Sequence, residues 1–173
     1  MRMMCWTRLD EMKSKLIIGV MWNDEEVLNE AIEELKKEFG AVEKESFTYD
    51  FSLITDYYEE EMGKNLNKKW LVFKELVEMD DLAAIKLKTG DIEKGFSTNN
   101  KRKINIDPGY ITHEQFILAS LKGSAHKIHL HSGVWAHLIY VLTKTKCIEF
   151  GRTFPDLRKE EMQKFLLEVR NSL

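Results

Sequence analysis

A strand-like apolar run that leads directly into an amphipathic helix is the feature that most constrains this fold. Residues 15–22 form a run with no charged residue after Lys15, which is typical of a buried strand. Asn23 then fits the N-cap of a helix, and Glu26 three residues later completes a capping-box pattern. Apolar residues recur at helical spacing as far as Phe39, and Gly40 is expected to end the helix. This segment therefore predicts a sheet with a helix packed on it.

The rest of the chain continues to alternate between strand-like and helix-like patterns. Residues 46–53 alternate apolar and polar side chains, as a half-buried strand does, and residues 82–96 carry an apolar stripe at helical spacing. Pro108-Gly109 fits a type II turn, and Thr112 with Gln115 predicts the capping box of a short helix. The other expected elements are strands over residues 70–73, 103–106 and 147–150, a loop over residues 55–68, a hairpin of residues 125–131 and 134–143 around Ser132-Gly133, and a C-terminal helix from about residue 156.

The succession of these elements predicts an α+β fold. The first six follow the order β-α-β-β-α-β, which is that of a ferredoxin-like unit. We expect a mainly antiparallel or mixed sheet with helices packed on it. The 173 residues suffice for one domain with a substantial core, and we assign residues 15–173 to it. Residues 1–14 are expected to be a disordered tail.

The composition tells more about the cellular compartment of the protein than about its function. The two cysteines form no disulfide framework, no signal-peptide pattern opens the chain, and no apolar run reaches the roughly 20 residues that span a bilayer. We therefore expect a cytoplasmic protein with no membrane partner. Residues 1–62 carry 7 Lys/Arg against 16 Asp/Glu, and residues 63–173 carry 19 against 13. This asymmetry indicates either an acidic pole beside a basic surface or charges that mix once the chain folds.

Several short segments along the chain form a recognisable set, namely residues 15–19, 24–26, 55–63, 85–89, 105–110, 126–128, 133 and 154–156. With these segments the chain resembles a bacterial and archaeal family classified as domain of unknown function number 4416, over about 160 residues. The resemblance implies no activity or cofactor, because no function is established for that family. His137, His129 and His131 depart from the expected pattern, which has an acidic residue after the hairpin turn and Tyr and Gly before it.

An acidic loop over residues 55–63 is the first candidate for chemistry. Asp56 is followed there by Tyr57, Tyr58 and three glutamates. Clustered carboxylates suit hard divalent cations such as Mg²⁺ or Ca²⁺, which prefer oxygen ligands. A solvated helix start is the alternative, because carboxylates are also favourable at a helix N-terminus.

The segment from Asn105 to Tyr110 is the second candidate. Asn105 and Asp107 share one face of the predicted strand, because side chains alternate along it. With Tyr110 beside a tight turn, they can form the wall of a polar pocket, and Asp107 with Asp56 can hold a divalent cation. The alternative is that Asp107 only caps the turn.

Four histidines lie within twelve residues and form the third candidate. In the predicted hairpin, His126 and His137 share one face within reach of one another, on a side that resembles the core. A hydrogen-bonded core position is the ordinary reading of such a histidine. His129 and His131 share the other face, and they form a minority alternative for a transition-metal pair.

These residues favour a small-ligand binding protein, for a phosphate- or nucleotide-like molecule, that can also be a divalent-metal-assisted enzyme. His126 is its candidate acid or base, because an imidazole titrates near neutral pH, and Asp107 its other catalytic residue. Lys86 or Lys122 is the candidate anion contact. A non-enzymatic module that binds RNA or protein through the basic second half stays open. No common nucleotide-binding, hydrolase or zinc motif occurs in the sequence. Gly90 and Gly95 have the spacing of a phosphate-binding loop, but Phe96 follows them where that loop needs Lys.

Overall fold

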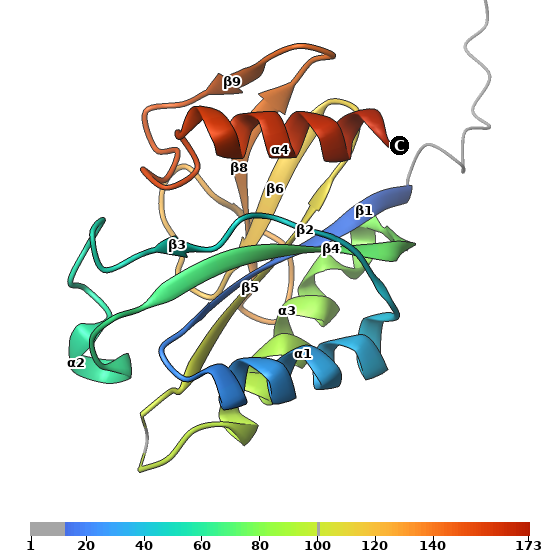
Figure 1. Cartoon of the computed structure of the whole chain (residues 1–173). Coiled ribbons are helices and arrows are strands. Elements are labelled where there is room, and N and C mark those ends of the chain that lie inside the picture. Colours follow the sequence, from blue (N-terminus) through green and yellow to red (C-terminus); the bar gives the residue numbers. More distant parts are fainter. Residues whose placement is uncertain (1–12, 100) are drawn as a thin grey trace, which may run out of the picture.

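Residues 13–99 and 101–173 of the computed structural model form an antiparallel sheet of nine strands with four α-helices (Figure 1). The α+β class is therefore confirmed. A short 3₁₀ turn, Met79–Asp81, precedes α3. The elements are β1 (Lys13–Trp22), α1 (Glu25–Phe39), β2 (Val42–Glu45), β3 (Tyr49–Asp50), α2 (Glu59–Met62), β4 (Asn67–Glu78), α3 (Leu82–Gly95), β5 (Ile104–Ile111), β6 (Gln115–Ser120), β7 (Ile128–His129), β8 (Trp135–Leu142), β9 (Cys147–Glu149) and α4 (Glu160–Asn171).

The strands are ordered β2-β4-β1-β5-β6-β8-β7, with β3 paired to β4 and β9 paired to β8. Helix α1 links β1 to β2, and α3 links β4 to β5, so two strand–helix–strand units interleave in the first half. The ferredoxin-like assignment stays a prediction, because β3 and α2 interrupt the expected succession. Within the described residues, no helix is long and apolar enough to cross a membrane.

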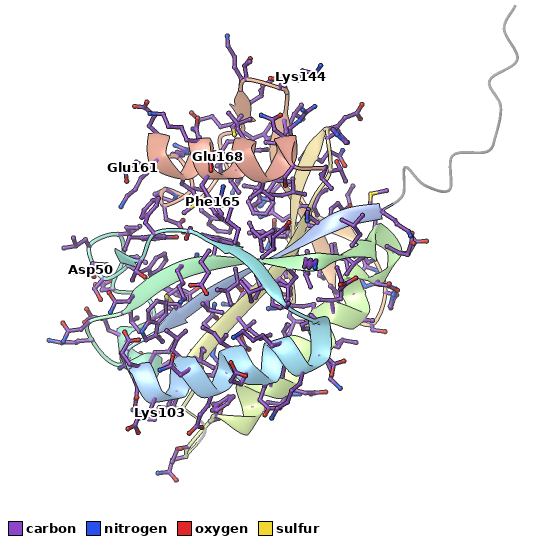
Figure 2. All side chains as sticks on the ribbon, turned by 45° about the vertical axis from the view of Figure 1, so that its right-hand side comes forward. Asp50, Lys103, Lys144, Glu161, Phe165 and Glu168 are labelled. Carbon is purple, nitrogen blue, oxygen red and sulfur yellow. The ribbon has the colours of Figure 1, made fainter. Side chains whose placement is uncertain are left out.

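The sheet is covered on both faces, which explains the unbroken apolar run of β1. Ile18 and Val20 belong to the core that the sheet forms with α1 and α3. Ile17 and Met21 alternate with them and join the opposite core, which α4 covers (Figure 1). Phe165 points from α4 toward the sheet, and it is 7% exposed (Figure 2).

Two segments are extended where we predicted a turn and a helix. Pro108-Gly109 lies inside β5, because β1 pairs with this strand along its whole length. Residues 115–120 form β6 instead of a helix. The Thr112 hydroxyl does accept hydrogen bonds from the backbone N–H groups of Glu114 and Gln115, but it does so in the β5–β6 turn. A helix start and a tight turn share these local bonds, so pairing with neighbouring strands decides between them.

Element boundaries differ from the prediction in the first half of the chain. The α1 N-cap is Asp24, whose carboxylate accepts from two backbone N–H groups, whereas Asn23 donates to the Met62 carbonyl. Residues 46–53 contribute only the two-residue β3, and Leu53 at the end of the predicted strand is 85% exposed. The predicted loop over residues 55–68 contains α2 and the first residues of β4. Of the predicted tail, residues 13 and 14 belong to β1, and residues 1–12 lie outside the described part of the chain.

The histidine hairpin forms with a register one residue away from the prediction. His129 pairs with Trp135 and Ile128 with Ala136, so the loop is longer than the two residues expected. Ile128 is 73% exposed, so the predicted core face does not extend to the short strand β7.

Candidate functional site

A gap between β5 and β6 is the structural origin of the candidate site. The two strands pair only from Gly109 with Leu118 to Ile111 with Phe116. Beyond Gly109 toward the start of β5, the backbone groups of Ile106 bond to side chains of α3. The Lys86 Nζ donates to the Ile106 carbonyl oxygen at 2.9 Å, and the Ile106 N–H donates to the Glu93 carboxylate. Two charged side chains therefore supply the hydrogen bonds that a neighbouring strand would otherwise make at this point. Buried backbone N–H and C=O groups need such partners.

Gly109 allows the two strands to meet where they begin to diverge. A Cβ atom at this position would lie 2.2 Å from the carbonyl oxygen of Ile117, which is a backbone atom that cannot rotate away. A side chain here would push β6 from β5. The glycine therefore fixes the closed end of the gap.

A pocket of about 450 Å³ lies between the diverging strands. This volume falls within the roughly 300–1,000 Å³ that is common for small-molecule sites. Side chains from α3, β5, β6, the β6–β7 loop, β8 and the segment before α4 converge on it. The lining residues are Tyr58, Lys86, Glu93, Arg102, Asn105, Asp107, Leu118, Ala119, Ser120, Leu121, Lys122, Lys127, His137 and Phe154.

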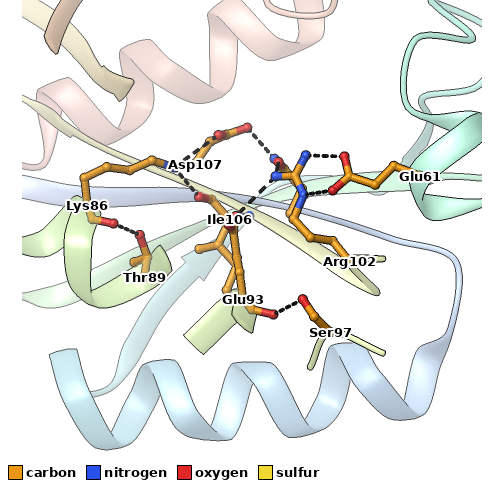
Figure 3. A network of polar contacts seen from close by, with 9 residues as sticks. Glu61, Lys86, Thr89, Glu93, Ser97, Arg102, Ile106 and Asp107 are labelled. Atoms are coloured by element: carbon orange, nitrogen blue, oxygen red, sulfur yellow. Dashed lines mark hydrogen bonds and ion pairs between the residues drawn. The ribbon is translucent and has the colours of Figure 1, made fainter. Parts of the chain in front are cut away.

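A chain of polar contacts fixes one wall of the pocket (Figure 3). The Arg102 guanidinium donates to both carboxylate oxygens of Glu61, at 2.6 and 2.7 Å, and to the Asn105 side-chain oxygen at 2.8 Å. The Asn105 amide in turn donates to the Asp107 carboxylate at 2.7 Å. Asp107 also lies 3.6 Å from the Lys86 Nζ. Bidentate pairing of this kind is geometrically specific, so the wall is held in one arrangement.

The ionisation of this wall follows from its pairing. Hydrogen bonding to Arg102 lowers the pKa of the Glu61 carboxyl, and the same pair raises the pKa of the Arg102 guanidinium. Glu93 is 9% exposed, and burial raises its pKa against the opposing effects of Lys86 and the Ile106 N–H. The five charged side chains that line or support the wall are therefore paired among themselves, namely Glu61, Lys86, Glu93, Arg102 and Asp107.

Two lysines at the other side of the pocket are not paired in this way. The Lys122 Nζ donates to the Tyr57 hydroxyl at 2.8 Å and lies 5.1 Å from the centre of its ring. The Lys127 Nζ donates to the Ser120 hydroxyl at 2.8 Å and to the Lys122 carbonyl at 2.9 Å. Neither ammonium forms an ion pair with a carboxylate in the described part of the chain. Burial and the charge of Lys122 lower the pKa of Lys127, so two positive charges repel each other there.

His137 completes the lining and has an unsatisfied nitrogen. The residue is 3% exposed, and its Nε2 atom has no hydrogen-bond partner among residues 13–99 and 101–173. Its ring packs edge-on against His126, with centroids 4.7 Å apart, and against Phe154, with centroids 5.4 Å apart. Burial, His126 and Lys127 lower the pKa of His137 to about 4, so the ring is neutral at pH 7.

Comparison with known proteins assigns the chain to one family. Residues 12–173 match the family described as a domain of unknown function, DUF4416. The chain belongs to this family. No curated protein and no solved structure shows significant similarity to it. Two of the segments that carried the resemblance, residues 55–63 and 105–110, both contribute residues to the pocket of this DUF4416 member.

The structure brings four of the predicted ligand-binding residues into one pocket together with Asp107, which we predicted as a catalytic residue and cation ligand; the four are Tyr58, Lys86, Asn105 and Lys122. Tyr57 lies at the rim through its hydrogen bond to Lys122. Asp56 is exposed and Tyr110 half-buried, and neither lines the pocket.

The histidines that we predicted as site residues, His126, His129 and His131, do not line the pocket. His126 is exposed and reaches the pocket only through its contact with His137, which it makes from the loop before β7 and not from the predicted strand face. His129 packs on Trp135, and His131 bonds to the Ser132 hydroxyl; both are exposed. The described residues contain no group of three or more His, Cys, Asp or Glu that could hold a metal ion. The predicted cation ligands Asp56 and Asp107, and the alternative pair of histidines, therefore have no third such ligand beside them.

Sequence reasoning missed Glu93, Arg102, Lys127 and His137 as members of the lining. A signal for Glu93 existed in the sequence, because it follows Lys86 by seven residues on one face of a predicted helix. Charged residues at that spacing on an otherwise apolar face of a helix indicate that they form hydrogen bonds or ion pairs with a neighbouring segment. Arg102 and Lys127 carry no such pattern, since each reaches the pocket from a loop.

Proposed function

We propose that the β5–β6 pocket binds a small anionic molecule that carries a phosphate group, such as a nucleotide-like compound. The carrying observation is that Lys122 and Lys127 both line the pocket and that neither ammonium has an ion-pair partner among residues 13–99 and 101–173. Across the lining, four Lys or Arg side chains face two carboxylates, Glu93 and Asp107, and Glu61 behind the wall pairs with Arg102, so the positive charges still outnumber the negative ones. A bound anion would relieve the repulsion between the two lysines and balance this excess.

Aromatic and apolar side chains around the lysines support a ligand with an organic portion. Tyr58 and Phe154 line the pocket, and Phe154 is 42% exposed. Tyr57 at the rim is 65% exposed and Leu121 is 56% exposed. Exposed aromatic rings beside cationic groups suit a planar ring joined to a phosphate. We limit the proposal to binding, because only Asp107 of the predicted catalytic pair lines the pocket.

A melting-temperature screen with a matched pair of variants tests this function. Inorganic phosphate, sugar phosphates and mononucleotides are added to the protein, each with EDTA and with Mg²⁺. A ligand that binds only the folded state at a hundredfold excess over its Kd stabilises by about 2.7 kcal/mol. For a domain of this size we expect a rise in the melting temperature of about 5–10 °C.

The double substitution Lys122→Met with Lys127→Met should remove this rise. Lys144→Met with Lys146→Met is the matched control, because it deletes two exposed lysines of the β8–β9 turn (Figure 2 labels Lys144). Equal responses of the two double variants would show that the pocket lysines do not hold the ligand. A response to single-stranded RNA alone, falling steeply with salt, would instead support the nucleic-acid-binding alternative.

The setting of this activity is also a proposal. We infer a cytoplasmic protein, which is supported by a composition with only two cysteines and no disulfide framework, and a prokaryotic source, which is supported only by the resemblance to a bacterial and archaeal family. Fractionation of a native source with an antibody against the protein would test this inference, and recovery in a membrane or secreted fraction would contradict it.

A further inference from the structure

The unsatisfied nitrogen of His137 points to one particular kind of ligand atom. Buried polar atoms in folded proteins are nearly always hydrogen-bonded, so a lone one needs an explanation. The Nε2 of His137 belongs to a side chain that lines the pocket and is 3% exposed. An acceptor atom on a molecule in the pocket would satisfy it, provided that Nε2 carries the ring proton.

Lys122 and Lys127, which line the same pocket, supply further donors. An ammonium group has three N–H donors. Lys122 uses one of them on the Tyr57 hydroxyl, and Lys127 uses two on Ser120 and the Lys122 carbonyl. The remaining N–H groups and the His137 Nε2 therefore form a set of donors that no described residue accepts from. Contacts with Ser120 and Tyr57 hold both ammonium groups in place.

We propose that this set binds the dianionic terminal phosphate of a phosphomonoester, with His137 donating from Nε2 to one phosphate oxygen. The inference rests on the function proposed above and names the substrate class of that site. A terminal phosphate has three acceptor oxygens and a charge of about −1.5 to −2 at pH 7. It therefore matches both the donors and the two unpaired lysines. A phosphodiester or a carboxylate carries a single negative charge and leaves one lysine uncompensated.

Phenyl phosphate and methyl phenyl phosphate separate these cases by calorimetric titration at pH 7.5. The two probes share the phenyl ring and differ by one methyl group, which converts the dianion to a monoanion. We expect phenyl phosphate to bind at least tenfold more tightly. Affinities within a factor of two would overturn the monoester inference and leave the anion-binding pocket in place. Binding of neither probe, nor of any other phosphate compound in the screen, would overturn both.

Two substitutions at His137 test the hydrogen bond itself. His137→Gln keeps an N–H donor at a similar reach, whereas His137→Leu has a similar volume and no donor. We expect the glutamine variant to stay within about threefold of the wild-type affinity for phenyl phosphate and the leucine variant to lose at least tenfold. Unchanged affinity in the leucine variant would remove His137 from the site. Equal loss in both variants, with melting temperatures at or above the wild-type value, would show that ring shape matters and not the donor.

Discussion

Replacement of His137 by leucine should stabilise the unliganded protein, which is an unusual outcome for a buried position. An unsatisfied buried polar group costs about 1–3 kcal/mol, and leucine removes it at nearly constant volume. Leucine fills the same space and keeps apolar contact with His126 and Phe154, so we expect about half of the roughly 0.5–1.5 kcal/mol that each edge-on aromatic pair contributes to be lost, or about 1 kcal/mol for the two pairs together. We therefore expect a net gain of about 1 kcal/mol in the free energy of unfolding at pH 7.

The gain should grow as the pH falls, and this dependence is the sharper test. The pKa of His137 is lowered from 6.5 to about 4 in the folded protein, so the unfolded chain binds a proton first. The wild-type protein therefore loses stability as the pH falls from about 6.5 to about 4, whereas a protein without this imidazole does not. Between pH 7 and pH 5 the difference between the variant and the wild type should widen by about 2 kcal/mol.

Urea unfolding at pH 7 and pH 5, followed by tryptophan fluorescence, measures both quantities. Equal slopes against urea would show that the denatured states are comparable. His129→Leu is the control, because His129 is exposed in β7 and should change stability by less than about 0.5 kcal/mol at either pH. A leucine variant at position 137 that is less stable than the wild type at pH 7, or a difference that does not change with pH, would refute the reasoning.

Other substitutions test the framework of the pocket by the same unfolding assay. Gly109→Ala should destabilise the protein by about 2 kcal/mol or more, because its Cβ meets the Ile117 carbonyl oxygen, and an unchanged midpoint would contradict this. Gly90→Ala should instead stabilise α3 by up to about 1 kcal/mol, since its Cβ meets no atom within 4 Å. Asp156→Asn should cost about 3–5 kcal/mol, because it leaves the buried Lys68 ammonium without its carboxylate at 2.9 Å; a loss below about 1 kcal/mol would show that the pair is dispensable.

The sequence predicted correctly those helices and strands for which the spacing of apolar residues alone decides which face is buried. The strand predicted over residues 15–22 formed with two further residues at its start, and the helix that follows it also formed, because the strand buries both faces and the helix a single stripe. The shared strand face of Asn105 and Asp107 also appears, and their side chains are hydrogen-bonded. Contact between His126 and His137 forms for another reason than the one predicted: the one-residue change of register removes their shared strand face, and His126 reaches His137 from the loop before β7.

The errors fall where a tertiary partner overrides a local signal. Pro108-Gly109 is typical of a turn, yet pairing with β1 keeps the backbone extended. Thr112 makes the hydrogen bonds of a helix cap within a strand hairpin, so its pattern does not distinguish the two. Glu93 and Arg102 were missed because their roles depend on where α3 lies beside the open edge of β5. That position is set by packing between segments distant in sequence, which no local pattern records.

The pocket therefore contains charges of two kinds, and this separation is the strongest ground for a ligand. Lys86 and Glu93 bond to the backbone of Ile106, and Arg102 pairs with Glu61, so these side chains complete the gap between β5 and β6. Their replacement should act mainly on folding. Lys122, Lys127 and His137 complete no such gap: among the described residues neither ammonium has an ion-pair partner, and the buried Nε2 of His137 has no hydrogen-bond partner. Lys122 is exposed, and Lys127 is half-buried and attracted by Asp107, so water and this carboxylate reduce the cost of the two charges. The His137 nitrogen has neither, and an anion in the pocket that accepts from all three side chains gives it the missing partner.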